Sequence, residues 1–234
     1  MFFESPLTQG RFVRRYKRFF ADVELADGTE VVAHCANSGS MKGCLEPGCE
    51  AWLSRSSDPN RKLAWSLELL RPFGALCLVN TARPNALVYE AVTAGAVPEL
   101  AGYADARREV KYGDEGSRID LLLTGPGRPD CYVEVKSATM GVGGGVTRFP
   151  DAVTTRGTKH LRELALMASR GHRAVLLFCA SRDDTRVVEP ADDIDAEYAR
   201  TLRAVVREGV EVLAYRARLS EREITLRERV EVAV

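Results

Sequence analysis

The sequence has no excess charge of either sign, few aromatic residues and no long hydrophobic run. Its 234 residues include 33 Lys and Arg against 33 Asp and Glu, and aromatic residues make up 7%. This balance argues against a strongly basic protein that coats nucleic acid, although it allows a local basic surface. The lack of any apolar stretch of membrane-spanning length predicts that the protein has no membrane partner.

Cysteines are few, and the N-terminus has no leader pattern. The six cysteines are too scattered for a disulfide scaffold, so reduced, mostly buried thiols are expected. His34-Cys35 with Cys44 and Cys49 could in principle hold zinc, but the lack of a close Cys-x-x-Cys pair disfavours that alternative. Met1-Phe2-Phe3-Glu4 is acidic and lacks an apolar core, which argues against a signal peptide and predicts a cytoplasmic protein.

The first third of the chain has the patterns of β-strands. Arg11–Leu25 alternates like one long strand, Asp27-Gly28 is a hairpin turn signal, and Thr29–Cys35 continues as a strand. Further short strands are predicted at Glu50–Arg55, Leu63–Leu70 and Ala75–Val79. This spacing predicts a small β-barrel of the oligonucleotide/oligosaccharide-binding (OB) type over residues 1–82.

The pattern changes after Pro84, where helices and strands begin to alternate. Helices are predicted over Asn85–Ala94, Thr158–Ala168 and Asp195–Arg207. Strands are predicted at Arg108–Tyr112, Arg118–Leu122, around Val133–Lys136, and at Ala174–Cys179 and Val210–Tyr215. Gly141–Gly145 is predicted as a flexible loop, and Ile224–Val232 as an edge strand or a return into the first domain. Residues 83–234 are therefore predicted to form a mixed sheet flanked by helices, giving an α/β (α+β) protein.

A lone aspartate on one apolar strand and a Glu-x-Lys on the next carry the main chemical signal. Asp120 follows Arg118-Ile119, and Glu134-Val135-Lys136 lies one turn later. This arrangement resembles the PD-(D/E)xK pattern of metal-dependent phosphodiesterases, as in restriction-endonuclease-like folds. Because residues two apart on a strand share a face, Glu134 and Lys136 are predicted to point together.

The turn between these strands predicts that the two acids meet. Asp120 and Glu134 are equidistant from Gly127, so a symmetric hairpin puts them directly opposite each other. Opposed Cβ atoms lie about 5 Å apart, and two carboxylates that close repel unless a cation lies between them. Asp120, Glu134 and Lys136 are therefore the predicted catalytic residues, with the two acids as metal ligands.

The same symmetry extends one strand upstream and adds a tentative metal ligand. Glu109 and Asp120 are equidistant from the Asp114–Glu115 bond, which predicts three acids on one face of a three-stranded meander. Hard oxygen ligands favour Mg²⁺ or Mn²⁺. The alternative is that these acids are solvent-facing charges on a half-exposed sheet.

Two basic segments are predicted to bind nucleic acid. Arg14, Arg15, Lys17 and Arg18 alternate with aromatic residues, which combines phosphate-binding cations with rings that can stack on bases. The alternative for this segment is an edge strand kept soluble by charge.

The second basic segment lies at the start of the helix predicted over residues 158–168. Arg156 and Lys159 are placed to use the anion-binding properties of a helix N-terminus. Asp151, His160 and Glu90 are further cleft candidates, with His160 more often structural than a general base in such a position.

Longer motifs give a resemblance that covers the chain from about Gly10 to Tyr215. The residues that carry it are Arg15–Phe19, Asn37–Met41, Val79–Thr81, Glu109–Gly113, Ser117–Asp120, Glu134–Lys136 and Phe149–Leu161. Together they resemble the sugar fermentation stimulation protein A (SfsA) family. That resemblance implies an N-terminal OB-type barrel, a C-terminal nuclease-like domain, DNA binding and a regulatory link to sugar (maltose) metabolism.

The leading interpretation is a DNA-binding protein with a Mg²⁺-dependent phosphodiesterase site. One alternative is a DNA-binding regulator whose nuclease-like core is catalytically silent. Another is a metal-dependent hydrolase of a different phosphorylated substrate, because one fold hosts many chemistries.

Overall fold

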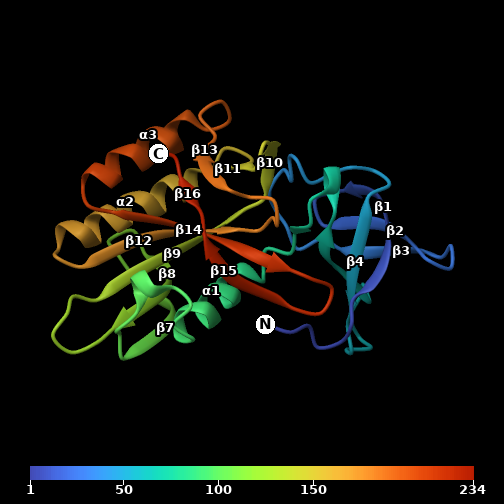
Figure 1. The fold of residues 1–234 in the computed structure, drawn as a ribbon, viewed down its shortest axis with the longest axis horizontal. Helices are drawn as coiled ribbons and strands as arrows, with labels where there is room; N and C mark the ends of the chain where they lie inside the picture. Colours follow the sequence, from blue (N-terminus) through green and yellow to red (C-terminus); the bar gives the residue numbers. More distant parts are fainter.

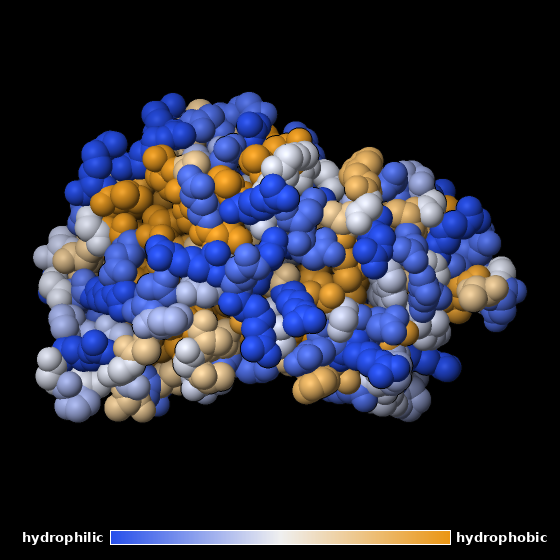
Figure 2. Space-filling view, in the orientation of Figure 1, coloured by the Kyte–Doolittle hydropathy of each residue, from blue (hydrophilic) through white to orange (hydrophobic).

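The computed structural model describes residues 1–234 as an N-terminal barrel packed against a C-terminal mixed sheet flanked by helices (Figure 1). This confirms the predicted fold class. On the face drawn in Figure 2 most of the surface is hydrophilic, and the main hydrophobic area lies over the larger, C-terminal unit. None of the helices has the length and apolar character that crossing a membrane requires.

The barrel is one sheet of six strands in the order β3-β2-β1-β4-β5-β6. Its strands are β1 (Thr8–Tyr16), β2 (Phe20–Leu25), β3 (Glu30–His34), β4 (Glu50–Arg55), β5 (Trp65–Leu70) and β6 (Cys77–Leu78). A short parallel pairing of β3 with β5 closes the sheet on itself. Phe12, Leu53 and Leu67 are among the buried residues that fill it. The predicted turn at Asp27-Gly28 is present, with Gly28 at φ 82°.

The prediction of one long strand from Arg11 to Leu25 is wrong, because the chain reverses after Tyr16. Lys17 and Arg18 both adopt positive φ, 46° and 64°, which makes a tight turn between β1 and β2. Neither residue is a glycine, so composition gave no turn signal here. The two strands then pair antiparallel, with Tyr16 opposite Phe20.

The C-terminal unit is built on a six-stranded sheet in the order β15-β14-β12-β9-β8-β7. Its strands are β7 (Asp105–Tyr112), β8 (Ser117–Thr124), β9 (Cys131–Ala138), β12 (Arg173–Ala180), β14 (Glu211–Leu219) and β15 (Ile224–Arg229). The first three form the predicted antiparallel meander, and β9, β12 and β14 run parallel. Strand β12 lies at the centre and is buried over Ala174–Ala180, as its unbroken apolar sequence predicts.

Helices cover both faces of this sheet. Helix α1 (Pro84–Thr93) packs on one face, where Leu87 and Val88 join the core beneath it. Helices α2 (Thr155–Ser169) and α3 (Ala196–Arg207) pack on the other face (Figure 1). The sheet therefore separates two apolar cores, and each buried apolar residue of its strands belongs to one of them.

A smaller sheet contains elements that the sequence patterns did not predict. Its strands are β10 (Met140–Gly143), β11 (Val146–Phe149), β13 (Val187–Pro190) and β16 (Glu231–Val232), in the order β10-β11-β13-β16. The prediction of a flexible loop at Gly141–Gly145 is wrong, because this segment is a hairpin whose turn uses the positive φ of Gly143, Gly144 and Gly145. Strands of two to four residues are too short to show alternation.

The N-terminal end of the chain contacts strand β15 of the C-terminal unit. Strand β15 pairs with β14 at the edge of the large sheet. Phe2 forms a bridge with Glu223, and the Ile224 N–H donates to the Met1 carbonyl at 2.9 Å. It is thus the N-terminal end that crosses between the two units.

Backbone hydrogen bonds join the barrel to the C-terminal unit. The Leu78 N–H donates to the Ser181 carbonyl at 2.8 Å, and the Asp183 N–H donates to the Leu76 carbonyl at 3.0 Å. The Asp183 carboxylate also accepts from the Leu76 N–H at 2.9 Å. A boundary between residues 82 and 83 stays a prediction. The backbone pairing itself fixes the orientation of the barrel relative to the C-terminal unit.

A single buried aspartate fixes the starts of α2 and α3. Asp195 accepts from the Tyr198 N–H at 2.9 Å as the N-cap of α3, and from the Thr154 N–H at 2.8 Å just before α2. Thr154 in turn caps α2 by accepting from the Gly157 N–H at 3.0 Å. Because Asp195 is only 5% exposed, water does not replace these bonds when they are lost.

We therefore expect Asp195→Ala to lower the free energy of unfolding by about 2 kcal/mol, since two backbone donors lose their acceptor. Urea unfolding followed by circular dichroism measures the change. Asp193→Ala is the control, because the Asp193 side chain is 69% exposed and its removal changes stability by less than about 0.5 kcal/mol. Equal effects of the two substitutions would contradict this account.

Candidate functional site

A cleft of about 480 Å³ lies between the barrel and the C-terminal unit. Both units contribute to its walls. The barrel side supplies Asn37, Ser38, Gly39 and Thr81, and the C-terminal side includes Asn85, Asp120, Glu134, Lys136, Arg148, Asp151, Thr154, Arg156 and His160. The predicted catalytic residues thus lie in one cavity, which neither unit forms alone.

The register of the meander is the one that the turns predict. Strands β8 and β9 pair at Leu121–Val133, Leu122–Tyr132 and Leu123–Cys131, which is symmetric about Gly127. The ladder ends there, and β9 continues beside β12 alone.

The strand rolls at Asp120, so the prediction of three acids on one regular face is wrong. Ile119 packs in the core under α2, whereas Leu121 packs in the core under α1. Two residues that far apart on a regular strand share a face. On the neighbouring strand, Glu109 lies between two paired residues but has φ 54° and does not pair. Opposite this irregularity, the Asp120 carboxylate contacts Val135 of β9 and Asn85 of α1.

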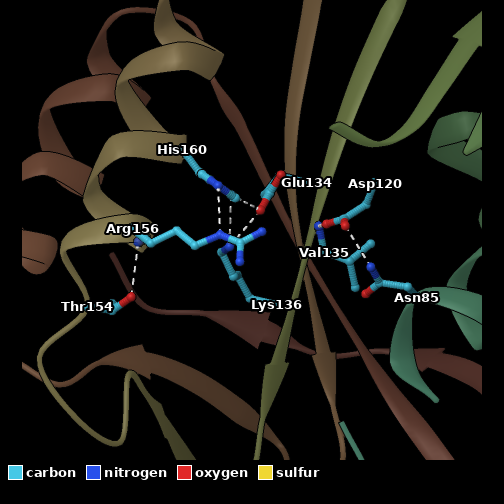
Figure 3. Close-up of polar contacts among 9 residues, drawn as sticks. Asn85, Asp120, Glu134, Val135, Lys136, Thr154, Arg156 and His160 are labelled. Carbon is cyan, nitrogen blue, oxygen red and sulfur yellow. Dashed lines mark hydrogen bonds and ion pairs between the residues drawn. The ribbon is translucent and has the colours of Figure 1, made fainter. Parts of the chain in front are cut away.

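Hydrogen bonds hold the Asp120 carboxylate in that gap (Figure 3). Oδ2 accepts from the Val135 N–H at 2.7 Å, and Oδ1 accepts from Nδ2 of Asn85 at 2.6 Å. Asn85 comes from the first turn of α1, which Pro84 starts at its N1 position. Asp120 therefore replaces the missing strand–strand hydrogen bond and is fixed from two elements.

Glu134 points from β9 toward α2 and is only 2% exposed (Figure 3). Its Oε1 accepts from Lys136 Nζ at 2.6 Å and is also in contact with His160 Nδ1. Its Oε2 is buried and has no hydrogen-bond partner. A buried carboxylate oxygen without a partner is costly, so this atom marks the incomplete part of the site.

The contacts of His160 fix its tautomer. Arg156 Nε approaches His160 Nε2 at 3.3 Å, and an arginine nitrogen can only donate. Nε2 is thus the acceptor, and Nδ1 of the neutral ring carries the proton that is donated to Glu134, while Lys136 Nζ lies 3.3 Å from the same Nδ1 and donates to Glu134 instead. His160 in this state orients the carboxylate and has no free basic nitrogen.

The two carboxylates have pKa values shifted in opposite directions. Burial and the charge of Glu134 raise the pKa of Asp120 to about 6, against the effects of the Val135 N–H and Lys136. Burial also acts to raise the pKa of Glu134, but the hydrogen bond from His160 and the charge of Lys136 outweigh it and leave that pKa lowered. Near neutral pH both groups are therefore charged, with Asp120 the closer to protonation.

Asp120 and Glu134 are hard oxygen donors, and no group of three or more His, Cys, Asp or Glu side chains is arranged to hold a metal ion. A cation here would take two carboxylates from the protein, with its other ligands from water or substrate oxygens. This is the usual mode for Mg²⁺, which keeps several waters. The unpartnered Glu134 Oε2 fits such a group.

Two of the predicted acids lie outside the cleft. Glu109 faces Asp120 by register but is exposed and makes no hydrogen bond or ion pair, and its charge is a minor contribution to the raised pKa of Asp120. Glu90 pairs with the N-terminal amine of Met1 at 2.6 Å. Neither is positioned as a metal ligand in this structure.

The residues before and in α2 divide between cleft and surface. Arg156 lines the cleft, whereas Lys159 turns away and donates to the Glu115 carbonyl at 2.7 Å. Asp151 lines the cleft and joins the two units, because its Oδ2 accepts from the Met41 N–H at 2.7 Å. Ser40 Oγ also donates to the Asp151 carbonyl at 2.6 Å.

The predicted basic segment on β1 is used in several different ways. Arg14 pairs with Asp22 at 2.8 Å. Arg15 donates to the carbonyls of Asn37 and Gly39 at 2.7 and 3.0 Å, so it organises the loop that forms the barrel wall of the cleft. Lys17 and Arg18 are exposed at the hairpin turn.

Sequence reasoning missed several cleft residues. The sequence marks the loop Asn37-Ser38-Gly39 only within the resemblance motif Asn37–Met41, and no pattern singles out Arg148. Gly39 has a clear reason for being glycine, because a Cβ there would lie 2.8 Å from Asp151 Oδ2. No pattern along the chain shows that a barrel loop closes a cleft more than a hundred residues away.

Two family models together match almost the whole chain. The model described as the SfsA N-terminal OB domain matches residues 13–79. The model described as the sugar fermentation stimulation protein RE domain matches residues 82–223.

Curated relatives match at similar length. The sugar fermentation stimulation protein homolog of Teredinibacter turnerae is 55% identical over 229 residues, covering 97% of each chain. The homolog of Geobacter metallireducens is 56% identical over 229 residues, again covering 97% of each chain.

A solved structure has the same fold. SfsA of Pyrococcus furiosus in complex with Ca²⁺ superposes with a TM-score of 0.87 at 26% identity, over 98% of this chain and 97% of that one. The barrel, the nuclease-type sheet and the whole-length matches lead to one conclusion: this chain belongs to the sugar fermentation stimulation protein (SfsA) family.

Proposed function

We propose that this protein is a divalent-metal-dependent phosphodiesterase that acts on DNA, with Mg²⁺ or Mn²⁺ as the metal. Asp120 and Glu134 are the proposed metal ligands and Lys136 the proposed cation beside the reacting phosphate. The observation that carries the proposal is the buried Oε2 of Glu134, which has no partner although it lies in a cleft beside a second carboxylate.

A divalent cation between the two carboxylates accounts for several features at once. It would give Glu134 Oε2 a partner and remove the repulsion that raises the pKa of Asp120. The Ca²⁺ complex of the Pyrococcus furiosus relative supports divalent-ion binding within the family. When bound, such a metal polarises a phosphate oxygen and lowers the pKa of a coordinated water.

The chain's own residues supply positioning and charge. Lys136 Nζ, 14% exposed at its side chain and 2.6 Å from Glu134, can donate to a phosphate oxygen that enters the cleft. Arg156 lines the same wall in the first turn of α2, where free backbone N–H groups and the helix dipole also favour an anion. Positive charge thus faces the two carboxylates from one side.

DNA as the substrate is supported by the composite cleft. Its walls are mainly polar, with few hydrophobic side chains, as expected for a phosphate backbone rather than for an apolar ligand. One wall comes from the barrel, and the matching family model describes that domain as an OB domain. OB barrels hold oligonucleotides or oligosaccharides. Of these two ligands, the oligonucleotide carries the phosphates that the proposed metal site would bind.

The direct test is cleavage of single- and double-stranded DNA with Mg²⁺ or Mn²⁺. We expect wild type to nick DNA and Asp120→Asn to reduce the rate at least about 100-fold, because the substitution removes a ligand charge. Glu90→Gln is the matched control, since Glu90 pairs with the N-terminal amine outside the cleft, and it leaves the rate unchanged.

The other outcomes of this assay point to different functions. A salt-sensitive gel shift without any nicking by wild type would indicate a DNA-binding regulator with a silent core. Failure of both nicking and binding would indicate a metal-dependent hydrolase of another phosphorylated substrate. Either result contradicts the proposal.

Stability without metal depends on the charge of Asp120. The pKa in the folded state, about 6, lies above the ordinary value of 3.8, so the folded protein binds the proton more tightly than the unfolded chain. The charge therefore destabilises the fold above pH 6, and this effect fades as the pH falls toward 4.

We expect Asp120→Asn to raise the free energy of unfolding by about 1–2 kcal/mol at pH 8 in EDTA, with the difference vanishing near pH 4. Added Mg²⁺ reverses the order, because it stabilises wild type alone. Thermal melting across pH measures both effects. A variant that is less stable than wild type at pH 8 in EDTA would refute the repulsion between the two carboxylates.

His160 is expected to act by orienting Glu134. His160→Ala should lower the cleavage rate about 10- to 100-fold, as for residues that orient metal ligands. His160→Asn should recover part of this loss, because its amide can donate to Glu134 from a position similar to Nδ1. If His160 were instead the general base, both variants would lose activity equally and the pH–rate profile would lose an ionisation.

A further inference from the structure

A second polar cavity, of about 410 Å³, lies on the barrel. Its wall contains few hydrophobic residues and many hydroxyl and cationic side chains. The residues that matter here are His34, Ser54, Arg55, Arg61, Ser66 and Arg83. The ends of β3, β4 and β5, the loop between β4 and β5, and the N-cap of α1 bring them together.

Only some of these cations are neutralised. Glu68 is 1% exposed and is fully occupied inside the wall, where it pairs with Arg83 at 2.7 Å and accepts from Ser54 Oγ and Asn80 Nδ2 at 2.7 and 2.9 Å. Arg83 is therefore fixed and its charge is balanced.

Arg55 and Arg61 differ from Arg83, because neither has a carboxylate partner. Arg55 lies over the Trp65 ring at 5.5 Å, and Arg61 donates to Ser66 Oγ at 2.8 Å. Both are exposed. The remaining acid of the wall, Glu4, is also exposed and makes no ion pair with them. The cavity thus offers two available guanidinium groups among hydroxyls, which is a chemistry suited to phosphate.

An aromatic surface adjoins these cations. The ring of Phe19 stacks on His34 with centroids 6.5 Å apart and planes 16° apart. Phe19 is 45% exposed, which is unusual for a phenylalanine and leaves ring surface in solvent. Exposed rings beside guanidinium groups are the combination that binds the bases and backbone of a single strand.

The cavity and the catalytic cleft share a partition. Ala36, Asn80 and Arg83 line the barrel cavity, and the adjoining residues Asn37 and Thr81 line the cleft. The two segments of the partition are joined by the Thr81 N–H, which donates to the Ala36 carbonyl at 3.0 Å. A DNA strand that crosses this partition would pass from Arg55 and Arg61 to the side that holds Asp120 and Glu134.

We propose that the barrel cavity binds a single-stranded segment of DNA whose continuation enters the catalytic cleft. Arg55 and Arg61 contact two phosphates, and Phe19 with His34 stacks on a base. This inference rests on the proposed action on DNA and adds the strand form of the substrate. A cavity of about 410 Å³ is in the size range of sites for one small ligand, so it accepts an unpaired nucleotide and excludes a duplex.

The test is equilibrium binding by fluorescence anisotropy, with a labelled oligonucleotide of about 12 nucleotides used alone or annealed to its complement. All proteins carry Asp120→Asn and the buffer contains EDTA, so that neither metal nor cleavage is required. The binding assay can then succeed where the nicking assay fails, and it can fail where the nicking assay succeeds, so the two proposals are tested separately.

We expect the single strand to bind at least about tenfold more tightly than the duplex. Replacing Arg55 and Arg61 together by alanine should weaken single-strand binding about tenfold or more. It should also reduce the slope of log K against log salt by about 1.4, or about 0.7 for each phosphate contact. Phe19→Leu should weaken binding about tenfold without changing the slope, since it removes a stacking surface and no charge.

The matched control is the pair Arg162→Ala and Arg207→Ala, which removes the same charge from exposed positions on α2 and α3. It should leave both affinity and slope unchanged. Equal affinity for single strand and duplex would overturn the proposal. So would an Arg55/Arg61 variant that behaves like the control, or a control that loses as much binding as that variant.

Discussion

The buried carboxylate of Glu134 and the half-buried carboxylate of Asp120 lie close together where the β8–β9 ladder ends, and the surrounding residues are arranged to stabilise them. Burial and the nearby charge of Glu134 both disfavour the charged form of Asp120, and together they raise its pKa to about 6. Val135 and Asn85 satisfy both oxygens of Asp120, and His160 satisfies one oxygen of Glu134. Three of the four oxygens are therefore fixed by protein donors. The fourth, Glu134 Oε2, is buried without a partner in a residue that lines the cleft, and a cation there would complete the balance of charge.

The barrel takes part in this site through one loop. Arg15 holds the carbonyls of Asn37 and Gly39, and the same loop accepts Asp151 of the C-terminal unit against the Met41 N–H. Backbone pairing around β6 fixes the rest of the contact. A change in the position of the barrel would therefore change the wall opposite the carboxylates. The barrel wall of the cleft and the carboxylates on the sheet are coupled by this contact, although the two units have separate cores.

The sequence predicted the register of the meander because hairpin register follows from the turn, and both turns are short and symmetric. It did not predict the roll of the strand at Asp120 or the positive φ of Glu109 opposite it, because glutamate has no intrinsic preference for that conformation. Local sequence patterns also did not predict which partners the charged side chains bind. Arg15 and Lys159 fit a phosphate-binding pattern, yet each donates to backbone carbonyls. These carbonyl groups lie on other segments of the chain, so the tertiary packing determines which side chains reach them.

The same reasoning explains how a chain with zero net charge can present cations to a nucleic acid. Net charge counts residues, whereas binding depends on which of them lack partners. Arg173 and Arg203 are matched by Glu211 and Asp192, and these pairs contribute little to any field at a distance. Arg55 and Arg61 lack such partners, and they lie together in a cavity that adjoins the two carboxylates through a thin partition. The uneven pairing of charges, rather than their sum, places unpaired guanidinium groups in the barrel cavity and two carboxylates in the adjoining cleft.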